Sequence, residues 1–465
     1  MVLVLFAGLS GGCSDTSRRS VEAAGRTPSY ALGLSAFDLE AVAAILPQGR
    51  GVEAFALLRA GTVAYTRMPG GFAARYDVTF LLREQETGEI VAERVLAETL
   101  RVSEYVDTQT TKAVRHQAFL AANPGAYICE VTIEDRNTGR SSFRRQAVIV
   151  PELGEGQAML GRVVMMSRDE HGMLGPAVAF HLPRRRDSLS AQAALFNFSA
   201  GSAWLLEVLL VRFVVDTAEA IAPWYFASGT AILDTRRYYP ERTDTVFMEH
   251  RRFFVTEPAF SVTVPLPWLS CGMYLLTMRV HGSEEPSSEV DAALTSRRYF
   301  AIMGPGFPRP GTLSEMAAAA VYLMKDEERR ALDSARSVDE RRRLFDGFWL
   351  SLVNDRQIAA DLIRKYYSRV EEANRLFSSF KEGWKTDRGM VYVVLGPPER
   401  IERSYDRETW YFNHPGSFRE NAWQFRRVQF APEQFVIEDY VLLRGVQYQM
   451  YWERVLSKWR EGVVF

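Results

Sequence analysis

The chain has 465 residues, which is too long for a single hydrophobic core, so about three domains are expected. Hydrophobic residues make up 47% of it and aromatic residues 12%, a composition typical of well-packed globular proteins and not of disordered ones. The 56 basic and 57 acidic side chains nearly cancel, so no overall positive charge favours nucleic acid or an anionic membrane surface.

The first residues, "MVLVLFAGLSGGCSDTSRRS", combine a short apolar run, small residues and Cys13. The run has the length of a signal-peptide core and is too short to span a bilayer. The small residues before Cys13 resemble a bacterial lipoprotein signal, which predicts lipidation at Cys13 and attachment to the membrane through that lipid. The alternative is a cleaved secretory signal with an incidental cysteine.

Either interpretation predicts an exported protein of the cell envelope. Ser14 after Cys13 is compatible with sorting to the outer membrane, on its periplasmic or its surface face. We therefore expect residues 1–13 to be the signal segment. Residues 14–30 are small, polar and without periodicity, which predicts a flexible tether.

Only Cys129 and Cys271 remain beyond the signal segment, one in each of two predicted domains. We expect buried free thiols and no disulfide. The CxxC and HxxxH spacings of zinc sites are absent from the sequence, so no metal and no cofactor are expected.

Alternating apolar and polar residues predict a first all-β domain over residues 31–152. The run "ARYDVTFLLREQETGEIVAERVL" indicates two antiparallel strands joined at "ETGE". Short β-rich runs broken by Gly, Ser and Pro predict a second such domain over residues 155–303.

Each of these two regions closes with a similar hairpin. Gly125 and Tyr127 open the penultimate strand of the first region, as Gly272 and Tyr274 do in the second. A polar turn and an Arg-Arg pair follow in both. The pattern predicts two tandem all-β, immunoglobulin-like sandwich domains.

The Pro/Gly-rich stretch of residues 304–311 predicts a linker, since it suits neither a helix nor a central strand. Beyond it the apolar period becomes helical. Thr312 with Glu315, and Ser337 with Glu340, have the spacing of capping boxes.

A longer helix is expected from Asp355, because apolar residues recur every three or four positions from there to Phe380. We expect Gly383 to end this helix with a positive φ angle. Four short strands should then form an antiparallel meander before a final helix that bears Trp452 and Trp459. The four strands are expected at Gly389–Leu395, Glu408–Phe412, Trp423–Phe430 and Phe435–Leu443. Residues 312–465 are therefore predicted to be an α+β domain with helices and a small antiparallel sheet.

Several catalytic classes lack their signatures in this sequence. "LGPPE" is a poor phosphate loop, because Pro397 and Pro398 have no N–H to donate. The GxSxG pattern of hydrolytic enzymes occurs only as "GLSGG" within the predicted signal segment, and the HExxH pattern is absent from the sequence.

Paired carboxylates remain a candidate chemistry. Asp387 and Glu399 would suit an acid and base pair of a glycan-acting hydrolase if the fold brings them together. Each also has an ordinary interpretation: Asp387 would accept backbone N–H groups in an Asx-turn, and Glu399 begins a charged hairpin edge.

The segment "EGWKTDRGMVYVVLGPPERIE", followed by "ETWYF", resembles the signature of the GWxTD-domain proteins. The resemblance covers about residues 310–465 and includes "FDGFW" and "YYSRVEEANRLF" upstream. It implies an exported bacterial protein with a signal, β-sandwich modules and the named domain, and it assigns no catalytic residue. The motif positions are Gly383, Trp384, Lys385, Thr386, Asp387, Gly389, Gly396, Pro397, Pro398 and Trp410.

A looser local likeness is to small outer-membrane assembly lipoproteins, in which "LGxP" precedes a "WxY" strand. Those proteins have a helix before the glycine, whereas the run before Gly396 here is predicted to be a strand. The likeness therefore indicates the compartment only.

Two classes of function remain open, with a third variant. The first is a non-enzymatic, lipid-anchored envelope protein that binds a protein partner through its C-terminal domain. The second is the glycan hydrolase described above. The third is a sugar- or peptide-binding surface built from exposed aromatic residues, for which the candidates are Trp224, Tyr225 and Trp268.

Overall fold

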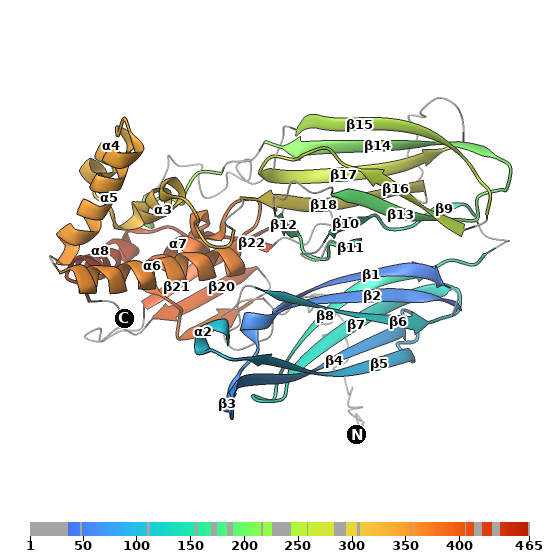
Figure 1. The fold of residues 1–465 in the computed structure, drawn as a ribbon, viewed down its shortest axis with the longest axis horizontal. Coiled ribbons are helices and arrows are strands. Elements are labelled where there is room, and N and C mark those ends of the chain that lie inside the picture. Colours follow the sequence, from blue (N-terminus) through green and yellow to red (C-terminus); the bar gives the residue numbers. More distant parts are fainter. Residues whose placement is uncertain are drawn as a thin grey trace, which may run out of the picture. The chain divides into compact units, whose positions relative to one another are not determined.

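The computed structural model describes residues 36–463, except for 47–48, 109–111, 154–156, 169–173, 184–188, 215–216, 226–242, 258, 283–293, 305–306, 354, 405, 413–420 and 430–437. Cys13 and the predicted tether lie outside the described residues. The chain divides into two compact units, Met1–Val150 and Pro151–Phe465, and each is described by itself. Most of the structure is β-sheet in several largely antiparallel sheets, and the long helices belong to the C-terminal region (Figure 1).

The first unit contains two sheets around one core. A three-stranded sheet has the order β1-β2-β6, and a larger sheet contains β5-β4-β7-β8 with the short β3 beside β4. Two short helical turns are η1 (Ala60–Thr62) and α2 (Tyr105–Thr108). The strands are β1 (Phe37–Leu46), β2 (Gly49–Arg59), β3 (Thr66–Met68), β4 (Gly71–Glu84), β5 (Ile90–Val102), β6 (Ala113–Ala121), β7 (Gly125–Asp135) and β8 (Arg140–Val150).

Alternation along the strands builds this core. In β4, Tyr76, Val78, Phe80 and Leu82 are all fully buried, and they pack with side chains of β2 and β7 in one cluster. The predicted hairpin is confirmed: β4 and β5 pair antiparallel, and Gly88 takes a positive φ of 74° in the turn between them.

The second unit begins with two further sheets around a common core. One has the order β11-β10-β13-β16 with β9 beside β13, and the other has the order β12-β18-β17-β14-β15. The strands are β9 (Met159–Leu160), β10 (Val164–Arg168), β11 (Leu174–Pro176), β12 (His181–Pro183), β13 (Ser190–Phe196), β14 (Ala203–Phe213), β15 (Thr243–Phe254), β16 (Ala259–Pro265), β17 (Gly272–His281) and β18 (Thr295–Met303).

The two β-rich regions have the same strand order. The series β5-β4-β7-β8 in the first corresponds to β15-β14-β17-β18 in the second, and β1-β2-β6 corresponds to β10-β13-β16. The hairpin tyrosines are also equivalent: the hydroxyl of Tyr127 donates to the carbonyl of Asn123 at 2.9 Å, and that of Tyr274 to the carbonyl of Ser270 at 2.8 Å. The repeated sequence pattern therefore reflects a repeated local structure.

The C-terminal region places helices against one four-stranded antiparallel sheet (Figure 1). The helices are α3 (Leu313–Ala319), α4 (Asp326–Asp333), α5 (Val338–Val353), α6 (Arg356–Phe377), α7 (Asp387–Leu395) and α8 (Gln449–Arg460), with 3-10 turns η4 (Ala320–Leu323), η5 (Gly383–Lys385) and η6 (Val446–Tyr448). The strands, in the order β19-β20-β21-β22, are β19 (Arg400–Arg403), β20 (Arg407–Phe412), β21 (Asn421–Gln429) and β22 (Glu438–Leu442).

The predicted helix starts are confirmed. Thr312 and Glu315 form the expected reciprocal capping box at α3. Asp355 caps α6, since its Oδ1 accepts from the N–H groups of Gln357 and Ile358 at 2.8 and 2.9 Å.

The predicted first strand of the meander is wrong. Residues 389–395 lie in α7, and the first strand of the sheet is β19 instead. Every residue of α7 from Asp387 to Leu395 is buried, so the helix shows no polar face that would distinguish it from a buried strand. The departure from the assembly lipoproteins noted above disappears, because a helix does precede Gly396.

The two cysteines of the described part of the chain are free thiols, as predicted. Cys129 is fully buried in β7, and burial raises the pKa of its thiol to about 12. Cys271, immediately before β17, is only half-buried.

Candidate functional site

The signature pentapeptide begins the buried helix α7. Thr386 is the N-cap: its Oγ1 accepts from the N–H of Gly389 at 3.0 Å and donates to the carbonyl of Gly383 at 2.7 Å. Asp387 is the first helical residue, where a carboxylate is favoured by the helix dipole. The pentapeptide thus folds into one 3-10 turn and one helix start.

The two glycines of this segment allow close backbone approach. A Cβ at Gly383 would lie 1.9 Å from the carbonyl oxygen of Ala373 in α6, and one at Gly389 would lie 1.8 Å from that of Gly383. The prediction that Gly383 ends a helix with a positive φ is wrong, because α6 already ends at Phe377. Gly383 is needed because its backbone contacts the α6 backbone directly.

Trp384 is buried where the pentapeptide meets η4 and α6. Its N–H donates to Asn374 Oδ1 at 3.2 Å, its carbonyl accepts from the Tyr322 hydroxyl at 2.9 Å, and the Tyr322 ring meets the indole edge-on at 6.0 Å. The ammonium of Lys385 lies 5.3 Å from the centre of the indole.

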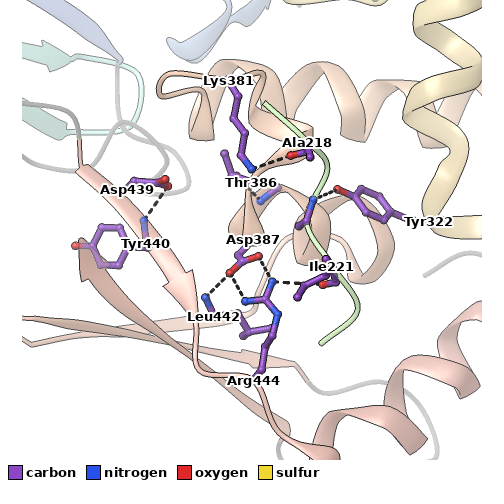
Figure 2. A network of polar contacts seen from close by, with 12 residues as sticks. Ala218, Ile221, Tyr322, Lys381, Thr386, Asp387, Asp439, Tyr440, Leu442 and Arg444 are labelled. Carbon is purple, nitrogen blue, oxygen red and sulfur yellow. Dashed lines mark hydrogen bonds and ion pairs between the residues drawn. The ribbon is translucent and has the colours of Figure 1, made fainter. Parts of the chain in front are cut away.

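Asp387 is held by contacts distant in the sequence. Its Oδ2 accepts from the N–H of Leu442 at 2.7 Å and from Arg444 Nη1 at 2.9 Å, and its Oδ1 accepts from Arg444 Nη2 at 2.5 Å (Figure 2). The expected Asx-turn is therefore wrong, since Thr386 does the capping and Asp387 forms a two-pronged ion pair. Asp387 is 7% exposed, so these partners compensate a largely buried charge.

A segment of the preceding β region crosses this ion pair. Residues 217–225, here called the strap, lie in the connection between β14 and β15. Figure 2 shows this segment running beside Asp387 and Arg444. The strap is therefore the route by which the β region reaches the signature pentapeptide.

Main-chain atoms of the strap make most of the hydrogen bonds. Lys381 Nζ donates to the Ala218 carbonyl at 2.9 Å, and Arg444 Nη2 donates to the Ile221 carbonyl at 3.4 Å. Two more hydrogen bonds complete the set. The Ala220 N–H donates to the Tyr322 hydroxyl at 3.3 Å, and the Gly445 N–H donates to the Pro223 carbonyl at 3.0 Å.

Two side chains of the strap also contact the C-terminal region. Glu219 pairs with Arg329 of α4, and hydrogen bonding to that guanidinium helps to lower the pKa of this carboxyl, against the opposing effect of burial. The ring of Trp224 meets that of Trp452 in α8 edge-on, at 6.5 Å between centres.

A second buried charge cluster lies beside the pentapeptide. Arg388 is 3% exposed, approaches Glu408 at 3.6 Å, and lies 4.3 Å from the centre of the Tyr440 ring. Asp439 is 2% exposed and accepts from the Tyr440 N–H at 2.9 Å. Burial raises the pKa of Asp439 to about 6, although Arg388 and Lys381 oppose the shift.

The far end of α7 has its own cap. Gly396 takes a φ of 90° and follows the last helical turn, so it ends a helix and not a strand as predicted. Arg369 Nη1 donates to the carbonyl of Val394 at 3.2 Å, and Trp459 Nε1 donates to the same carbonyl at 2.9 Å. Burial lowers the pKa of Arg369 to about 10.

The two candidate catalytic carboxylates lie at opposite ends of α7. Asp387 begins the helix, whereas Glu399 follows its end and is exposed. The helix between them rises about 12 Å at 1.5 Å per residue. Pro397 and Pro398 join α7 to β19, and Glu399 begins the sheet by donating its N–H to the Tyr411 carbonyl at 3.0 Å. The fold does not bring this pair into one group.

The other motif and aromatic candidates are dispersed. Trp410 is fully buried in β20, and its Nε1 donates to Glu408 at 2.6 Å. Trp224 and Tyr225 both belong to the strap, and Tyr225 and Trp268 are 59% and 60% exposed.

Sequence reasoning missed Tyr322 and Arg444, which join the pentapeptide to the strap. Arg444 is 57 positions from Asp387, and no local spacing connects the two. The one available signal was a buried signature carboxylate, because such a group needs a cationic partner somewhere in the chain.

Within the described ranges, no helix is long and apolar enough to cross a membrane. The same residues contain no group of three or more His, Cys, Asp or Glu side chains placed to hold a metal ion.

Comparisons with known proteins cover the C-terminal region well. Residues 288–461 match the model of the GWxTD domain. No curated protein matches the chain. A solved structure, the transglutaminase of red sea bream, matches 57% of this chain at 7% identity, with a TM-score of 0.17. The chain spans about a third of that structure, since 31% of it is covered. The resemblance read from the signature is confirmed, and the C-terminal region of this chain is a GWxTD domain.

Proposed function

We propose that this protein is an exported, lipid-anchored component of the cell envelope that binds a protein partner through its GWxTD domain. In this proposal it is not an enzyme, and the β-rich regions act as spacers that carry the domain. The expected localisation is the outer membrane, to which a lipid on Cys13 would attach the protein.

One observation carries the proposal. The signature carboxylate, Asp387, is buried and its two oxygens are engaged by Arg444 and the Leu442 N–H. An acid or base that serves a substrate needs access to it, whereas Asp387 instead orients the guanidinium that reaches the strap. The motif thus builds a contact between two parts of a protein.

We also propose that both β-rich regions are immunoglobulin-like sandwiches. Support comes from two sheets around one core, from the shared order β5-β4-β7-β8 and β15-β14-β17-β18, and from the tyrosine bonded to a backbone carbonyl. Tyr127 precedes Cys129 by two positions, as the corner tyrosine of immunoglobulin domains precedes its cysteine.

Capture from solubilised envelopes tests the docking role. Residues 151–465 are the fragment to use, because they form one compact unit. We expect this fragment to retain one envelope protein saturably and residues 31–150 to retain none. Equal capture by residues 31–150 would contradict the docking role of the GWxTD domain.

The lipid anchor has a separate test. Mass spectrometry of the protein from its native host should find acyl chains on an N-terminal Cys13. Cys13→Ser should release the protein from the membrane fraction, whereas Ser14→Ala should not. A soluble wild-type protein without acyl chains would leave the plain secretory signal as the better interpretation.

The glycan hydrolase is less favoured, because its two carboxylates begin and follow the same helix. A panel of cell-wall and polysaccharide substrates tests it directly. Activity that disappears in Asp387→Asn while the fold is retained would establish the enzyme and remove our proposal. A glycan array tests the exposed rings of Tyr225 and Trp268, with Tyr225→Ala and Trp268→Ala as controls.

A further inference from the structure

The contact between strap and GWxTD domain has the character of peptide recognition. Four of its hydrogen bonds go to main-chain groups, so they are available to any segment that adopts the same backbone path. Only Glu219 and Trp224 add the side-chain contacts described above.

The receiving groups are held in place by the domain itself. Arg444 is oriented by Asp387, and the Tyr322 hydroxyl donates to the Trp384 carbonyl. Neither of these two contacts involves the strap. A receptor that is organised without its ligand loses little entropy on binding.

The strap can leave without breaking the β region. It lies outside β14 and β15, which pair with each other from Ala203↔Phe254 to Phe213↔Thr243. β14 also pairs with β17 on its other side. The sheet therefore keeps its hydrogen bonds when the connection is displaced.

We propose that the surface under the strap is a binding site for extended peptide segments, and that the strap is its resident occupant in cis. This inference rests on the proposed function and names the partner's chemistry. The preferred ligand is an extended segment with a carboxylate for Arg329, followed four and five positions later by proline and an aromatic residue for Trp452.

Occupancy in cis regulates the affinity for a partner. A tethered segment acts at an effective concentration on the order of millimolar, so it competes with any segment offered in trans. The apparent Kd for a partner equals the intrinsic Kd divided by the fraction of molecules whose site is open, so a closed strap raises it. Weakening the strap should therefore tighten binding in trans.

A labelled peptide of residues 217–225, TAEAIAPWY, is the probe, and fluorescence anisotropy with the chain from residue 14 onward is the measurement. In the strap-weakened variant Glu219→Lys/Trp224→Ala, we expect the peptide to bind at least about tenfold more tightly than in the unchanged chain. A peptide with its tryptophan replaced by alanine should bind about tenfold more weakly, and a scrambled peptide should not bind.

A folded strap-weakened variant that does not bind the peptide would overturn the inference, as would equal binding of the scrambled peptide. If the double variant does not fold, Ala220→Pro replaces it, because this change removes one N–H donor of the strap and leaves the domain unaltered. Envelope capture without peptide binding contradicts this inference alone. Peptide binding without capture contradicts the proposed function alone.

Discussion

The two β-rich regions share the order of seven strands, and one connection between equivalent strands differs greatly in length. In the first, β4 and β5 are joined at Glu84–Ile90 by a tight turn, closed by the Gly88 N–H to the Glu84 carbonyl at 2.9 Å. In the second, the equivalent strands β14 and β15 are joined by residues 214–242, which include the strap. The same arrangement of strands therefore occurs with a short turn in one region and with a long connection that contacts the GWxTD domain in the other.

The largest effect should come from the two glycines at which backbone segments meet around the pentapeptide. Gly389→Ala should destabilise the second unit by about 5 kcal/mol or more, because its Cβ would lie 1.8 Å from a backbone oxygen. Gly347→Ala in α5 is the matched control, since no atom lies within 4 Å of its Cβ position and alanine favours a helix. Hydrogen exchange in α6 and in β4 distinguishes the two units. Equal destabilisation by both variants would contradict the close-approach argument.

Removal of the cation from the buried ion pair should have the next largest effect. Arg444→Ala leaves Asp387 buried without its cation and should lower the free energy of unfolding of the second unit by about 3–5 kcal/mol. The added change Asp387→Asn should recover part of this loss, and urea unfolding of the single and double variants measures the coupling. Additive losses would show that the pair is not coupled, and a change in the first unit would contradict the separation of the units.

Acid should affect the two units in opposite directions. Burial raises the pKa of Asp439 from 3.8 to about 6, so the folded second unit binds this proton more tightly, and the contribution of Asp439 to stability falls by about 3 kcal/mol in total as pH rises from 3.8 through 6. Burial lowers the pKa of His116 below 6.5, so the first unit loses stability as pH falls through 6.5. Hydrogen exchange at pH 5.5 and 7.5 checks both signs. Asp439→Asn and His116→Gln should each flatten the pH response of one unit only.

The smallest effect should come from the strap itself. Trp224→Ala removes the edge-on contact with Trp452 and should destabilise the helices of the second unit by about 1–2 kcal/mol. Tyr225→Ala, at a neighbouring side chain that is 59% exposed, should change stability by less than about 0.5 kcal/mol. Thermal unfolding followed by tryptophan fluorescence at pH 7 provides the measurement. Equal effects of the two changes would argue that the strap contributes no specific packing.

The repeated hairpins and the helix caps could be predicted because their signals are local. A glycine and a tyrosine at fixed spacing mark the start of a strand, and Thr312 three positions before Glu315 marks the start of a helix. Each signal lies within a few neighbouring residues. Helix α7 could not be recognised from its pattern, because it is buried on all sides and its valines also suit a strand. The capping Thr386 and the carboxylate of Asp387 in the first turn were the signals for a helix start, and the apolar run obscured them.

Only the motif residues of the site could be predicted from the sequence. The motif residues were found because they are close in the sequence, whereas Arg444, Tyr322 and the strap come from separate segments. Their meeting depends on the packing of α7 against β22 and on the path of a connection from another sheet. The hydrophobic periodicity of a sequence does not indicate contacts between such distant segments.

The strap adds a further attachment of the GWxTD domain to the second β region, beside the packing of Phe380 with Met273, Phe213 and Tyr299. A single covalent linker acts as a hinge, about which a domain can turn. The Gly445 N–H on the Pro223 carbonyl and the indole pair lie on α8 and the segment before it, far along the chain from the linker at residues 304–311. Attachment at separated points along the chain resists rotation, so a pull or a twist on the second β region is transmitted to the domain.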